Sequence, residues 1–146
     1  MYIAKDLTDL IGRTPVMELG HVFPDSPSRI LAKVELCNPT SIKDRAMLNM
    51  IQKAMQAGQI KPGSVVVEAT SGNTGIALAS LATIMGFQAR IYMSEACSIE
   101  RQKLICAYGA TVVLTPAAEH TRGARDRAIA YCEANPDTTF FASQHT

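Results

Sequence analysis

The sequence has 146 residues, with 14 basic and 13 acidic side chains and a formal charge of +1. This length predicts about one domain with a real core, and a hydrophobic fraction of 47% excludes a disordered chain. The near-neutral charge argues against nucleic acid as a partner, and the lack of Trp argues against base-stacking surfaces.

The first residues and the cysteines indicate the compartment. The opening MYIAKD lacks the basic start and apolar core of a signal peptide, and no apolar run is long enough to span a membrane. The four cysteines form no C-x-x-C pair, which favours reduced thiols in a cytoplasmic protein. Among them, Cys37 is expected to be a small buried hydrophobic residue.

The first predicted elements are two short strands, at residues 16–19 and 29–35. A helix is then predicted from Ser41 to Gly58, because apolar residues recur there at helical spacing. Ser41 is the expected N-cap, and Asp44 is the acid of a capping box.

Strands and helices alternate regularly in the rest of the chain. The predicted strands are 65–67, 89–93, 111–114 and 139–142, and the predicted helices are 74–85, 98–107 and 122–134. Ser98 is expected to cap the second of these helices, and Gly86 and Gly109 to end the first two. This alternation predicts an α/β fold with an open, mostly parallel sheet and flanking helices.

A loop of small polar residues, EATSGNTG at positions 68–75, joins a buried strand to an apolar helix. Ligands bind at the carboxyl ends of strands in open α/β sheets, and a helix N-terminus favours an anion. The loop matches neither nucleotide-binding glycine pattern. It is therefore a candidate site for a carboxylate or phosphate, with an ordinary capped turn as the alternative.

Lys43 lies at the start of the other helix, where a cation opposes the helix dipole. That field favours the neutral amine, which can act as a nucleophile or a base. The alternative is a solvated surface lysine.

Taken together, these segments resemble the cysteine synthase (O-acetylserine sulfhydrylase) family, its B-type members in particular, within the fold-type II pyridoxal-phosphate enzymes. The matching motifs are IGRTP at 11–15, NP at 38–39, SIKDRA at 41–46, IKPG at 60–63, EATSGNTGIALA at 68–79, SIER at 98–101 and YGA at 108–110. The resemblance covers nearly the whole chain.

The resemblance implies a role for each matching residue. Lys43 is similar to the lysine that bonds covalently to pyridoxal phosphate and later moves the Cα proton. Thr70, Ser71, Gly72 and Thr74 match the loop that binds the substrate α-carboxylate, and Gln144 matches a glutamine that helps to hold it. Asn73 matches the side chain that meets the cofactor's ring hydroxyl.

The implied reaction is a β-replacement in which O-acetylserine and sulfide give cysteine and acetate. The resemblance also implies an amino-acid substrate, a homodimer, and no nucleic-acid or membrane partner. Alternatives are a related enzyme that uses another nucleophile, of the cystathionine β-synthase or 2,3-diaminopropionate synthase type, and a truncated fragment without catalysis.

The sequence departs from the family pattern in three places. The loop before Lys43 is one residue short, and a usual glycine–methionine pair is replaced by His120-Thr121. No glycine-rich cluster that could bind the cofactor's phosphate follows Gly123. We therefore expect residues 1–40 to be strands that normally pair with a large domain missing from this chain. Residues 41–146 are expected to be the small mobile α/β domain of the tryptophan-synthase-β-like fold.

Overall fold

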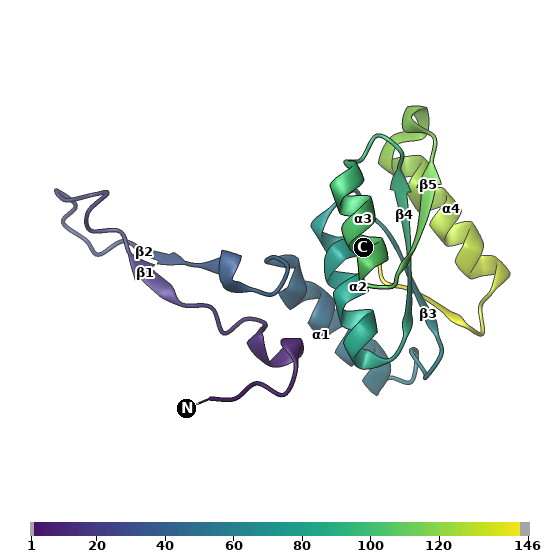
Figure 1. Cartoon of the computed structure of the whole chain (residues 1–146), viewed down its shortest axis with the longest axis horizontal. Helices are drawn as coiled ribbons and strands as arrows, with labels where there is room; N and C mark the ends of the chain where they lie inside the picture. Colours follow the sequence, from purple (N-terminus) through teal and green to yellow (C-terminus); the bar gives the residue numbers. More distant parts are fainter. Residues whose placement is uncertain (1, 144–146) are drawn as a thin grey trace.

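The computed structural model describes residues 2–143, in which a parallel four-stranded sheet forms the centre of an α/β body (Figure 1). The strands lie in the order β5-β4-β3-β6. Their bounds are β3 (Val65–Ala69), β4 (Gln88–Ser94), β5 (Thr111–Thr115) and β6 (Thr139–Phe141). The chain moves outward from β3 through β4 to β5 and then returns to place β6 on the other side of β3.

Helices cover both faces of this sheet, as Figure 1 shows. Their bounds are α1 (Lys43–Gln56), α2 (Asn73–Met85), α3 (Ile99–Ala107) and α4 (His120–Ala134). The first three pack on one face, and α4 packs on the other. The predicted α/β fold, with an open, mostly parallel sheet, is confirmed.

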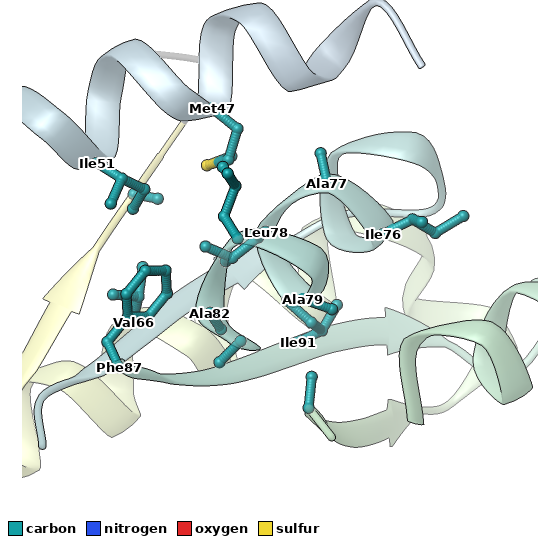
Figure 2. Packing of buried hydrophobic residues seen from close by; sticks show 14 of the residues in the cluster. Met47, Ile51, Val66, Ile76, Ala77, Leu78, Ala79, Ala82, Phe87 and Ile91 are labelled. Carbon is teal, nitrogen blue, oxygen red and sulfur yellow. The ribbon is translucent and has the colours of Figure 1, made fainter. Parts of the chain in front are cut away.

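The larger core lies between α1, α2 and the sheet. Met47 and Ile51, one turn apart in α1, point toward Leu78 of α2 (Figure 2), and all three side chains are almost fully buried. Burying a side chain of this size contributes about 1.5–3 kcal/mol. Because α2 is enclosed by α1, α3 and the sheet, it is apolar nearly all round, and its position behind the loop at 70–72 is well determined.

The N-terminal residues form a narrow arm that projects from the body (Figure 1). Its two strands, β1 (Val16–Glu18) and β2 (Leu31–Lys33), pair antiparallel with Met17 opposite Ala32. Short 3₁₀ turns, η1 (Leu7–Leu10) and η2 (Glu35–Cys37), flank the pair. The second strand is therefore shorter than predicted, and Cys37, which we expected to be buried, is exposed in η2. No layer of the described chain covers the arm, so its side chains have little to pack against.

A polar network joins the arm to the body. The guanidinium of Arg45 in α1 pairs with the Glu35 carboxylate at 2.7 Å and donates to the Gly12 carbonyl at 3.0 Å. Gly12 has a φ of 78°, and a β-carbon there would lie 2.7 Å from Nη1 of Arg45. Both facts require glycine. Hydrogen bonding to Arg45, above all, lowers the pKa of Glu35 from 4.5 to about 2.

The predicted helix starts need small corrections. α1 begins at Lys43, and Ile42 rather than Ser41 holds the N-cap position. The predicted acid still closes the turn, because buried Asp44 accepts from the amides of Thr40 at 2.8 Å and Ser41 at 3.2 Å. Ser98 does hold the N-cap position of α3, but its side chain makes no capping bond.

Two kinds of feature are absent from residues 2–143. No helix there is long and apolar enough to cross a membrane. That part of the chain also holds no group of three or more His, Cys, Asp or Glu side chains placed to bind a metal ion.

Candidate functional site

The polar loop at 70–72 begins where β3 ends, beside the point where the strand order reverses. The amide of Thr70 donates to the Tyr92 carbonyl at 3.0 Å, so the ladder with β4 extends one residue past the strand. The Thr70 hydroxyl then accepts from the Gly72 amide at 3.3 Å, and the Gly72 carbonyl accepts from Gly75 at 3.0 Å to start α2. The loop therefore lies at the carboxyl end of a central strand, where open α/β sheets bind their ligands.

The first turn of α2 faces this loop and contributes to an anion site. Backbone N–H groups of a first helical turn point away from the helix body, and the helix dipole is positive at that end. Ser71 and Asn73 are exposed, whereas Thr70 and Thr74 are buried. Hydroxyl, amide and N–H groups of this kind suit a carboxylate.

Lys43, the first residue of α1, lies across from the loop. Its own amide donates to the Ser41 hydroxyl at 3.2 Å, and Asp44 beside it closes the preceding turn. These bonds hold the start of α1, so the lysine side chain extends from a well-supported position. Lys43 is exposed.

The lysine and the loop share one cavity of about 340 Å³. This volume is within the range of small-molecule sites. Its lining residues carry hydroxyl, amide, backbone or cationic groups, and none is an acid: Lys43, Thr70, Ser71, Gly72, Asn73, Thr74, Arg101 and Thr121. A cavity with two cations and no carboxylate favours a ligand with a negative charge.

A larger hollow of about 540 Å³ lies on the outer side of α4, far from this chemistry in kind. Its charged groups already pair with one another, Arg127 with Glu119 at 2.9 Å and Arg122 with Asp126 at 3.8 Å. We assign it no role, because paired charges on a solvated helix face are ordinary surface structure.

Six of the seven predicted site residues line the cavity: Lys43, Thr70, Ser71, Gly72, Asn73 and Thr74. The seventh, Gln144, lies outside the described residues.

Two lining residues were not among the predicted site residues. Arg101 belonged to the SIER motif without a role, and Thr121 was noted only as a departure. The residue before Thr121, His120, has a φ of 50°, which favours glycine. The sequence carries no signal that brings α3 and α4 to this cavity, because that proximity arises from helix packing.

The chain matches the family model described as pyridoxal-phosphate-dependent enzyme over residues 7–146. It therefore belongs to this family. Among known proteins, it is 46% identical over 128 residues to cysteine synthase B of Salmonella typhimurium, which covers 87% of this chain and 42% of that protein. A cysteine synthase of Staphylococcus aureus is 47% identical over 124 residues, covering 84% of this chain and 40% of that protein.

Solved structures agree with these sequence matches. A cysteine synthase from Entamoeba histolytica superimposes with a TM-score of 0.91 at 37% identity, over 98% of this chain and 44% of that one. An O-ureido-L-serine synthase gives 0.88 at 38% identity, over 98% and 45%. The chain thus spans less than half the length of the relatives that it matches.

The cavity residues fit the reactive end of the family's cofactor. Pyridoxal phosphate carries an aldehyde, and a primary amine such as that of Lys43 can bond to it covalently. The lining set also offers the amide side chain of Asn73 and the anion-binding loop. The fit concerns the aldehyde and the ring, since the lining residues include no separate loop for the phosphate.

Proposed function

We propose that this chain supplies the lysine and the carboxylate-binding loop of a pyridoxal-phosphate-dependent β-replacement enzyme. The reaction converts an O-activated serine, such as O-acetylserine, and sulfide into cysteine and acetate. The observation that carries the proposal is the single cavity that Lys43 shares with residues 70–74. An amine opposite an anion site is the arrangement needed to bind an α-amino acid and act on its Cα proton.

The loop binds the substrate in this proposal. Its N–H groups and the Thr70, Ser71 and Thr74 hydroxyls receive the α-carboxylate, aided by the positive end of α2. Gln144, by resemblance, also contacts the carboxylate. Fixing this end of the substrate orients Cα and its hydrogen toward Lys43, which raises the rate by positioning.

Lys43 holds the cofactor covalently and moves the proton, while Asn73 contacts the ring hydroxyl. The bound cofactor supplies an electron sink for the negative charge at Cα. The Lys43 amine takes the Cα proton, and acetate leaves Cβ with its bonding electron pair. Hydrosulfide then bonds to Cβ, and Lys43 returns the proton to Cα, so atoms and charge balance.

The test uses the visible absorbance that appears when a protein amine bonds to pyridoxal phosphate. We expect the purified chain to develop this band, and Lys43→Ala to lose it. Lys53→Ala is the matched control, since Lys53 is an exposed lysine in the last turn of the same helix. Borohydride reduction and peptide mapping should place the label on Lys43. A band of equal intensity in Lys43→Ala would contradict the proposal.

A second candidate differs only in the nucleophile. Thr121, rather than the family's usual methionine, lines the cavity, so the shape and polarity of the acceptor pocket differ. Mass spectrometry of products from O-acetylserine with sulfide or with an amine nucleophile separates the two. Exclusive use of the amine would replace sulfide in the proposal.

Two partners complete the proposal, the amino-acid substrate and a second copy of the full-length protein as a homodimer. Sedimentation of the full-length protein tests the dimer, and a monomer at all concentrations would contradict it.

A further inference from the structure

Arg101 is a cavity-lining residue without a role in the reaction proposed above. It lies in the first turn of α3, and its guanidinium reaches across to the anion loop. Nη1 of Arg101 donates to the Ser71 carbonyl at 3.3 Å. The guanidinium carbon also lies 3.7 Å from the place that a β-carbon on Gly72 would take, so it rests on the face of that residue.

α3 holds this arginine in place through a buried contact one turn further on. Residues four apart share a helix face, and the partner of Arg101 on that face is Ile105. Ile105 is fully buried and reaches to 3.2 Å from the β-carbon position of Gly75. One face of α3 therefore contacts the loop region twice, with an apolar anchor at Gly75 and an arginine over Ser71 and Gly72.

The charge of Arg101 is not consumed elsewhere in the described part of the chain. No carboxylate of residues 2–143 forms an ion pair with it. A guanidinium has five N–H donors in a rigid plane, and the carbonyl of Ser71 uses one of them. The side chain can thus hold the loop and keep its positive charge at the rim of the cavity.

We propose that Arg101 is a positioning residue for the carboxylate-binding loop. Its planar guanidinium, docked on the Ser71 carbonyl and on Gly72, keeps the loop in the shape in which its N–H and hydroxyl groups converge on a carboxylate. This inference rests on the proposed function, because it assigns the support of the same loop. It goes further in naming α3 as the element that sets the loop's geometry.

Three variants of the 146-residue chain separate positioning from charge. Arg101→Met removes both the guanidinium and its charge, and Arg101→Lys keeps the charge but loses the planar group. Lys103→Met makes the same change of net charge on α3 at an exposed residue that does not line the cavity. Amide NMR spectra report on the loop, and acetate serves as the carboxylate probe.

In the free protein, we expect hydrogen exchange of the Ser71, Gly72 and Asn73 amides to accelerate in both Arg101 variants and to stay unchanged in Lys103→Met. In acetate titrations, both Arg101 variants should bind about tenfold more weakly than the parent, the effect of losing one charge-assisted hydrogen bond. Lys103→Met should bind as the parent does.

Different results overturn different claims. Unchanged exchange in both Arg101 variants would overturn the positioning role, as would an Arg101→Lys variant that binds acetate as tightly as the parent. If the parent protein shows no acetate-induced shifts at residues 70–74, the carboxylate role of the loop in the proposed function fails. In that case the exchange data still decide whether Arg101 holds the loop.

Discussion

Gly75 shows how one residue sets the distances around the site. A β-carbon at this position would lie 2.9 Å from Cγ2 of Thr70, 3.1 Å from Cγ2 of Ile91 and 3.2 Å from Cδ1 of Ile105. These three side chains are buried and β-branched, so they have little freedom to move aside. The missing side chain therefore lets the start of α2 approach the sheet and α3 closely.

Gly75→Ala should destabilise the protein. Overpacking of a core costs about 1–3 kcal/mol, and alanine recovers about 1 kcal/mol of helix propensity, so we expect a net loss of about 1 kcal/mol. Urea unfolding measures the change. Gly20→Ala, at an exposed glycine with no atom within 4 Å of the β-carbon position, should stay within about 0.5 kcal/mol of the parent. A Gly75→Ala protein as stable as the parent would show that the neighbours yield.

At the scale of elements, α1 connects the candidate site with the arm. Lys43 begins the helix, and Arg45, two residues later, pairs with Glu35 of η2 and with Gly12. Asn38 adds to this joint, because its side-chain oxygen accepts from the Gly12 amide at 2.9 Å and its amide donates to the Glu35 carboxylate at 2.8 Å. The same helix start thus carries the reactive amine and the attachment of the arm.

The low pKa of Glu35 makes this joint sensitive to acid. Its pKa of about 2 is below the ordinary 4.5, so the unfolded chain binds more protons between these values. The contribution of the pair to stability is therefore complete above pH 4.5 and is lost as the pH falls toward 2. Unfolding measured across this window should show a smaller pH dependence in Glu35→Gln.

Glu18→Gln is the control for this experiment. Glu18 pairs with Arg29 at 3.0 Å, but both side chains are largely exposed, and such pairs contribute little. We expect this variant to follow the pH dependence of the parent. Identical curves for Glu35→Gln and the parent would mean that the Arg45–Glu35 pair does not stabilise the folded state.

Over the whole molecule, the arm and the body differ in how they are supported. The body places a buried sheet between helix layers, whereas the arm is a two-stranded pair with exposed apolar side chains at Val16, Met17 and Leu31 (Figure 1). A lone two-stranded pair has marginal stability in water. The two parts should therefore open with different free energies.

Hydrogen exchange with mass spectrometry should separate these parts. We expect peptides from β1 and β2 to exchange at least about a hundredfold faster than peptides from β3 and β4, which are the internal reference in the same sample. Equal protection would contradict an uncovered arm. A dilution series would then reveal whether a second copy of the chain covers it.

Local patterns predicted much of the body correctly. Gly86 ends α2 with a φ of 78° and donates its amide to the Ala82 carbonyl at 3.1 Å, as a glycine stop signal should. The apolar run at 65–67 is the centre of β3, because a strand covered on both faces needs continuous apolar residues. The predictions for β2 and for Cys37 were wrong because the arm has no layer above it, and a pattern of β-branched residues does not report whether such a layer exists.

The sequence by itself determined the α/β class, the anion loop after β3 and the lysine at the start of α1. These features follow from hydrophobic periodicity, glycine positions and a specific set of motifs, all of which act over a few neighbouring residues. Only the tertiary structure decided that Arg101 and Thr121 join the same cavity and that Arg45 attaches the arm. Those contacts link residues far apart in the chain, and the packing of α3 and α4 around the sheet sets them.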